Sequence, residues 1–96
     1  MNLEIIEELW EVIQDRKVNP KKGSYTNRLL ADEKLIFKKL KEELDEIEES
    51  IKSGKLGSEK DGAVWEVSDF LYHLLVLLAA EGIELDDVMK ELRRRR

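Results

Sequence analysis

The stretch WEVSDFLYHLLVLLAAEG, residues 65–82, decides the fold of this chain. Its apolar residues occupy every side of a helix, and only a few polar residues, among them Glu66, Asp69 and His73, interrupt them. A helix that is apolar all round is expected to be buried on all sides. Two carboxylates and an imidazole in such a helix need a specific reason, because burying an unpaired charge is costly.

Four main helices and one short helix are predicted from the hydrophobic periodicity on both sides of this stretch. No strand-like alternation and no internal repeat appear in the sequence. The pattern therefore predicts an all-α helical bundle that forms a single domain over residues 1–96. The expected helices cover, in chain order, residues 3–17, 25–31, 33–53, 61–81 and 85–94.

Residues that favour helix ends support these boundaries. Ser24 and Asp32 precede apolar runs and are expected to cap the second and third helices. Ser58 and Asp61 have the spacing of a capping box in front of the long helix, with Asp in place of the usual Glu. Gly82 follows the last apolar residues and is expected to end that helix.

Composition and length narrow the possible partners. The chain has 96 residues, with 22 acidic against 17 basic side chains and a net charge of -5, which argues against nucleic acid as a partner. It has no cysteine, so disulfides and thiolate metal sites are excluded. No basic secretory leader precedes the first helix, and the apolar run 70–80 is shorter than the about 20 residues that span a bilayer. We expect a cytoplasmic protein without a membrane partner. A chain this short cannot cover an all-round apolar helix alone, so we also expect a homodimer around it.

The helix predicted over residues 33–53 carries a second group of acids. Glu43 falls only about 20° outside the edge of its apolar stripe, and Glu46 lies one turn further on at the same flank. Glu43 and Glu46 therefore form an i, i+3 pair, as Glu66 and Asp69 do on the long helix. The stripe itself is expected at Ile36, Leu40, Leu44, Ile47 and Ile51.

Two such pairs on facing helices would gather four negative charges, which repel strongly at short range. A cation is the natural remedy, and an all-oxygen site favours Mg²⁺ or Mn²⁺ over Zn²⁺. Because Mg²⁺ commonly bridges carboxylates to substrate phosphates, the acids point to phosphate chemistry. The structural alternative is a solvated acidic face, as we expect for Asp45, Glu48 and Glu49. His73 is more readily interpreted as a satisfied core histidine than as a ligand.

The acids also carry a resemblance to a known family. EELDE followed by EVSD resembles the signature of the all-α, MazG-like nucleotide pyrophosphohydrolases. LWEVIQDRKVNPKKGSYTNRLL and WEVSDFLYHLLVLLAAEGIELDDVMKEL are similar to the start and end of phosphoribosyl-ATP pyrophosphohydrolases. Lys41 and Leu44 stand where that family usually has small residues. The resemblance implies a dimeric helical bundle that releases pyrophosphate from phosphoribosyl-ATP with Mg²⁺, in the second step of histidine biosynthesis.

The resemblance also implies roles for the acids, and the negative charge of the phosphates suggests roles for the basic residues. The expected metal ligands are Glu42, Glu43, Glu46, Glu66 and Asp69, and Glu43 or Glu46 would be the catalytic base. Basic residues around the Gly-Ser-Tyr-Thr turn and before the acidic motif are expected to meet the phosphates. The expected substrate-binding set is Arg16, Ser24, Tyr25, Thr26, Arg28, Lys38 and Lys39.

Two other functions remain open at this point. A house-cleaning nucleoside triphosphate pyrophosphohydrolase would share the acidic signature and the metal. A non-catalytic helical dimer module would use the same acids only as surface charge. Substrate preference separates the first alternative, and Mg²⁺-dependent stabilisation separates the second.

Overall fold

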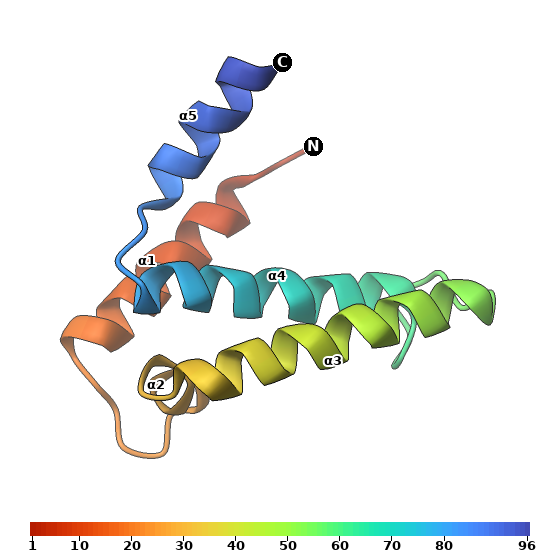
Figure 1. The fold of residues 1–96 in the computed structure, drawn as a ribbon, viewed down its shortest axis with the longest axis horizontal. Coiled ribbons are helices and arrows are strands. Elements are labelled where there is room, and N and C mark those ends of the chain that lie inside the picture. Colours follow the sequence, from red (N-terminus) through yellow and green to blue (C-terminus); the bar gives the residue numbers. More distant parts are fainter.

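The computed structural model describes all residues, Met1–Arg96, and every regular element in it is a helix (Figure 1). The prediction of an all-α fold with four main helices and a short one is confirmed. The helix boundaries fall within two residues of the predicted ones. In chain order the helices are α1 (Glu4–Val18), α2 (Tyr25–Leu30), α3 (Glu33–Lys52), α4 (Ala63–Ala80) and α5 (Leu85–Arg95).

The helices α3 and α4 form an antiparallel hairpin, which is the most extensive helix contact in the molecule (Figure 1). The helix α1 packs on α4, and α2 packs against α1, α3 and α4 near the start of α3. The helix α5 projects away from the hairpin, on the same side as the N-terminus. The molecule therefore has a closed end, where α1 and α2 cover the hairpin, and an open end near the turn between α3 and α4.

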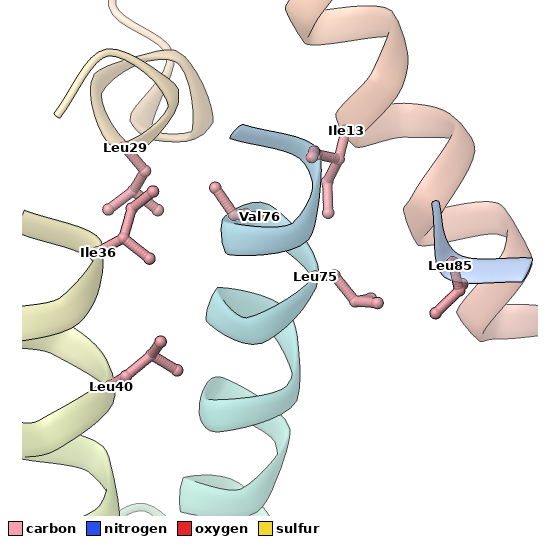
Figure 2. Packing of buried hydrophobic residues seen from close by; sticks show 8 residues of the cluster. Ile13, Leu29, Ile36, Leu40, Leu75, Val76 and Leu85 are labelled. Atoms are coloured by element: carbon pink, nitrogen blue, oxygen red, sulfur yellow. The ribbon is translucent and has the colours of Figure 1, made fainter. Parts of the chain in front are cut away.

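The hydrophobic core lies at the closed end, where side chains from four helices and the start of α5 meet (Figure 2). Ile13 of α1, Leu29 of α2, Ile36 of α3 and Val76 of α4 are its largest fully buried side chains. Each such burial contributes about 1.5–3 kcal/mol relative to an exposed side chain. This core fixes the relative positions of α2, α3 and α4, which carry the candidate site.

Three of the predicted helix ends are confirmed. The Ser24 hydroxyl accepts a hydrogen bond from Asn27 N, and the Asp32 carboxylate accepts one from Leu35 N. Gly82, with a φ of 70°, ends α4 as predicted. Its own N–H donates to the Ala79 carbonyl and that of Ile83 donates to the Leu78 carbonyl, which is the bonding pattern of a Schellman motif.

The predicted capping box at Ser58 and Asp61 is wrong. Asp61 has a φ of 67°, a left-handed conformation that cannot belong to the helix, and α4 begins only at Ala63. Loop carbonyls take the place of a capping side chain, because the N–H groups of Ala63 and Val64 donate to the carbonyls of Lys55 and Gly57. This loop closes so tightly that a Cβ at residue 62 would collide with the Gly57 carbonyl oxygen.

The predicted apolar stripe of α3 is only half correct. Ile36 and Leu40 are buried as expected, but the side chains of Leu44 and Ile51 are 57% and 55% exposed. Glu43 and Ser50, each one residue earlier, are buried in their place. The inward face of α3 therefore becomes polar towards the open end of the hairpin, and apolar side chains lie outside.

The helix α4 shows the same inversion. It is not buried on all sides within one chain, since Val64, Trp65, Val67 and Leu71 are exposed while Glu66 is buried. By length and composition α4 could also cross a bilayer, with a mean hydropathy of 1.5. Its packing along α3 and its buried Glu66 and His73 are those of a core helix.

Candidate active site

The candidate site begins where the hydrophobic core ends. Beyond Leu40 of α3 and towards the N-terminus of α4, the interior of the hairpin is lined by Glu43, Glu66 and His73. Glu43 and Glu66 are only 6% and 3% exposed, so each of the two i, i+3 pairs contributes one deeply buried carboxyl. The sequence predicted burial of Glu66 from the apolarity of α4, but it placed Glu43 only at the margin of the buried face.

Burial and neighbouring charges together disfavour an ionised Glu43. Loss of hydration is the largest cause, followed by repulsion from Asp69, Glu46 and Glu66, and the pKa of Glu43 rises to about 7. Lys39 opposes this shift. The repulsion shows that the four carboxyls predicted to form one cluster act on one another in the folded chain. A solvated acidic face, the structural alternative, would not bury two of them.

Glu66 is perturbed in the same direction. Its hydrogen bond with Glu46, its burial and the nearby negative charges raise the pKa of the Glu66 carboxyl to about 7. Two carboxyls can share such a bond only when one of them holds a proton. Glu46 itself is exposed, and Asp69 is partly buried, so the cluster runs from the interior of the hairpin to its surface.

One imidazole lies against this cluster. The Nδ1 atom of His73 is 3.0 Å from Glu43 Oε1 and 2.8 Å from the carbonyl oxygen of Asp69. The short contact to Glu43 is not a hydrogen bond, because an N–H at Nδ1 points to the Asp69 carbonyl, and Glu43 Oε1 is left without a donor. Glu66 Oε2 is the other buried side-chain atom without a partner.

The short helix α2 is fastened to α4 beside the acids by two tyrosine hydroxyls. The Tyr25 hydroxyl lies 2.7 Å from His73 Nε2, and the Thr26 hydroxyl is hydrogen-bonded to that of Tyr72. Both tyrosine rings stand edge-on to the imidazole. Of the three turn residues predicted to bind substrate, Tyr25 lies close to the acids, and its pKa is raised by burial and by the charges of Glu43 and Asp69. Thr26 is held to α4 by Tyr72, and Ser24 uses its hydroxyl as the N-cap of α2.

Of the basic residues predicted to bind phosphate, two lie near the acids or the turn, one is exposed on α3 and one pairs with another residue. Arg28 is exposed and lies over the Tyr25 ring, 5.7 Å from its centroid, and Lys39 lies close enough to Glu43 to influence its pKa. Lys38 is exposed on α3. Arg16 pairs with Asp15 at 3.3 Å.

One predicted metal ligand, Glu42, and one basic residue before the Ser24 turn, Lys17, have other partners. Glu42 pairs with Lys39 at 3.6 Å and is not among the acids that perturb Glu43 and Glu66. Lys17 belongs to the basic stretch around the Ser24 turn, but its ammonium donates to the Ala79 carbonyl at the end of α4. Lys17 therefore fastens α1 to α4 and is not free to meet a phosphate.

Sequence reasoning missed Asn27. Its side-chain amide donates to the Arg16 carbonyl and its oxygen accepts from Lys21 N, so it shapes the whole turn that carries the basic residues. Asn27 lies in the first turn of α2, just after the segment that contains Pro20 and Gly23, and this position is the only local signal for such a role. The Tyr25–His73 contact was also missed, because its partners are 48 residues apart in the sequence.

The donor set fits a hard divalent cation. All four clustered groups are carboxyls, and two of their oxygens are buried without a hydrogen-bond partner. As the side chains stand, no three carboxylate or imidazole groups lie together closely enough to hold one ion. Four carboxylates at short range repel one another, so a bound cation would be needed to hold their oxygens closer together.

Comparison with known proteins identifies the family of this chain. Residues 6–96 match the family described as phosphoribosyl-ATP pyrophosphohydrolase. The chain is 44% identical over 95 residues to the phosphoribosyl-ATP pyrophosphatase of Clostridium novyi, covering 99% of this chain and 84% of that protein. It is 41% identical over 95 residues to the phosphoribosyl-ATP pyrophosphatase of Methanococcoides burtonii, covering 95% of that protein.

A longer type of relative is also similar. The chain is 48% identical over 93 residues to the histidine biosynthesis bifunctional protein HisIE of Caldanaerobacter subterraneus subsp. tengcongensis. That match covers 97% of this chain but only 44% of the relative, so the chain spans less than half the length of the bifunctional relatives. The match to the family extends over nearly the whole chain and includes both acidic motifs. The chain belongs to the phosphoribosyl-ATP pyrophosphohydrolase family.

Proposed function

We propose that this protein hydrolyses phosphoribosyl-ATP to phosphoribosyl-AMP and pyrophosphate in histidine biosynthesis. The observation that carries the proposal is the pair of buried carboxyls, Glu43 and Glu66, each of which has a buried oxygen without a hydrogen-bond partner. Glu46 and Asp69 lie close enough to raise the pKa of both. A bound cation would offset the negative charge of these carboxyls. The family membership supplies the substrate class. No observation favours a plain nucleoside triphosphate, and the family match argues against a non-catalytic module.

The cofactor is proposed to be Mg²⁺, with Mn²⁺ as a substitute. Glu43, Glu46, Glu66 and Asp69 would hold it, and the bound ion would supply positive charge against the triphosphate. Glu42 joins this set only through the family resemblance, because in the structure its carboxylate contacts Lys39.

The chain's own groups then have distinct tasks. Glu43 or Glu46 accepts the proton of the attacking water, and the water oxygen bonds to phosphorus as the α–β phosphoanhydride bond breaks. Pyrophosphate leaves with the electron pair of that bond. Arg28 of α2, which lies over the Tyr25 ring, and Lys39 of α3, which lies near Glu43, are placed to offset phosphate charge. The contribution of the protein is mainly positioning and charge stabilisation.

The partner is proposed to be a second copy of the same chain. The open end of the hairpin exposes Leu44 and Ile51 on α3 together with Trp65 and Leu71 on α4, while acids occupy its interior. An apolar exterior of this extent is typical of a surface that another chain covers. Covering it with a second hairpin would bury α4 on all sides. A cytoplasmic location accords with this arrangement and with the absence of cysteine.

Pyrophosphate release from phosphoribosyl-ATP, with Mg²⁺ and with EDTA, tests the proposal directly. We expect release only with the metal, and a kcat/KM for phosphoribosyl-ATP far above those for ATP and deoxynucleoside triphosphates. A preference for a deoxynucleotide would contradict the substrate and favour a house-cleaning enzyme. Full activity in EDTA would contradict the proposed requirement for Mg²⁺.

A further inference from the structure

Three side chains form a continuous chain of contacts from the basic turn to the acids. The Tyr25 hydroxyl on α2 meets His73 Nε2 at 2.7 Å, and His73 Nδ1 on α4 meets Glu43 Oε1 on α3 at 3.0 Å. His73 is 6% exposed, and it is the only histidine in the sequence. These contacts link three helices, and the proposed reaction does not use His73.

The atoms around the imidazole determine where its proton lies. Nδ1 faces the Asp69 carbonyl, which can only accept a hydrogen bond, and Glu43 Oε1, which can only accept one when ionised. A neutral imidazole must therefore carry its hydrogen on Nδ1. Nε2 is then an acceptor, and the Tyr25 hydroxyl is the donor that satisfies it. Each contact favours the next, so together they favour one ring orientation and the Nδ1–H tautomer.

Tyr25 consequently determines whether the imidazole nitrogen that faces Glu43, Nδ1, carries the hydrogen. Loss of the Tyr25 hydroxyl would leave a buried Nε2 without a partner, which favours another ring orientation or tautomer. A ring with a bare Nδ1 would present a lone pair to Glu43 Oε1 and repel it. Residues that contact a metal ligand from behind commonly control its orientation and its affinity for the metal.

We propose that His73 is a positioning residue that couples the substrate-binding turn to the metal-binding acids, with Tyr25 as its anchor. This inference rests on the proposed metal role of Glu43. It assigns to Tyr25 an effect on Mg²⁺ affinity, although Tyr25 is on another helix and is not a ligand. It also gives the turn a means to sense the metal, because any movement of Tyr25 moves the imidazole.

A neighbouring hydrogen bond provides a matched control. The Tyr72 and Thr26 hydroxyls join the same two helices beside the same imidazole, with ring centroids of Tyr72 and His73 5.2 Å apart. That bond does not touch a nitrogen of His73. Tyr72→Phe therefore removes a comparable α2–α4 hydrogen bond and leaves the Tyr25–His73–Glu43 chain of contacts intact.

Mg²⁺ binding measured by calorimetry on the full chain tests the proposal. We expect Tyr25→Phe to weaken Mg²⁺ binding roughly 10-fold, and His73→Leu by roughly 10- to 100-fold, as for other partners behind a metal ligand. His73→Asn, which can keep an N–H near the position of Nδ1, should restore most of the affinity. Tyr72→Phe should bind as wild type does. Equal losses in Tyr25→Phe and Tyr72→Phe would overturn the proposal, since both would then report looser docking of α2.

The tautomer of His73 gives a second measurement that needs no metal. Because the chain has one histidine, its ring ¹⁵N signals are identified without ambiguity. At pH 8.5 we expect the Nδ1–H tautomer in wild type and a shift towards the other tautomer in Tyr25→Phe. A dominant Nε2–H tautomer in wild type would overturn the inference. Absence of Mg²⁺ binding by wild type would instead contradict the proposed function, so the two failures are distinguishable.

Discussion

Replacing Glu43 by Gln should stabilise the protein in the absence of divalent cations. Glutamine has nearly the shape of a protonated glutamic acid but cannot ionise, and Glu43 is buried with a pKa of about 7. Its pKa in the unfolded chain is the ordinary value of 4.5. At pH 8 the folded wild type therefore carries a charge that its surroundings disfavour, whereas the variant does not.

The size of the effect follows from the two pKa values. Each pKa unit corresponds to about 1.4 kcal/mol. The shift therefore sets an upper limit of about 3 kcal/mol on the amount by which Glu43→Gln can raise the free energy of unfolding. Water near the exposed Glu46 screens part of this, and we expect a gain of about 1–2 kcal/mol. For a chain of this size that is a rise of about 4–15 °C in Tm.

The pH dependence has a definite sign. A carboxyl with a raised folded pKa binds more protons in the folded than in the unfolded state, so stability falls as pH rises. Its contribution is complete below pH 4.5 and is lost as the pH passes through about 7. Wild type should lose stability over this window, and Glu43→Gln should lose less. The two should be nearly equal at pH 4.

Urea unfolding in EDTA at pH 4, 6 and 8, at one protein concentration, measures these differences. Glu49→Gln, an exposed change on the same helix, is the control and should have no effect. Addition of Mg²⁺ should reverse the order at pH 8, because only wild type offers the full set of ligands. A variant that is less stable than wild type in EDTA at pH 8 would refute the reasoning and make Glu43 a structural partner of His73.

Three further outcomes are expected. Asp69→Asn should reduce pyrophosphate release by about 10²-fold or more without changing the far-UV circular dichroism, and unchanged turnover would remove Asp69 from the site. Wild type should sediment as two chains of 11.3 kDa each, and Leu71→Glu should shift the protein to the monomer; a wild-type monomer at micromolar concentration would contradict the proposed partner. Phosphoribosyl-ATP carries a phosphate on its phosphoribosyl group that ATP lacks. Arg28→Ala should therefore lower kcat/KM for phosphoribosyl-ATP much more than for ATP, and equal losses would show that Arg28 does not contact this phosphate.

The sequence alone determined the local structure of this protein. Helix positions follow from apolar spacing, and the ends at Ser24, Asp32 and Gly82 follow from side chains or backbone conformations that act within a few residues. The predicted carboxylate pairs followed equally well, because the i, i+3 spacing is a property of one helix. Where a longer loop folds back on itself, as before α4, local spacing failed and Asp61 was misplaced.

Only the tertiary structure decided which of these side chains meet. The packing of α3 on α4 turned Glu43 and Ser50 inwards and left Leu44 and Ile51 outside, although the periodicity of α3 alone favoured the reverse. The contacts of His73 with Tyr25 and Glu43 join three helices across 48 and 30 positions of sequence. No spacing rule reaches that far, since side-chain periodicity fixes the face of a helix relative to its own axis, whereas the core at Leu29, Ile36 and Val76 fixes how the helices are placed.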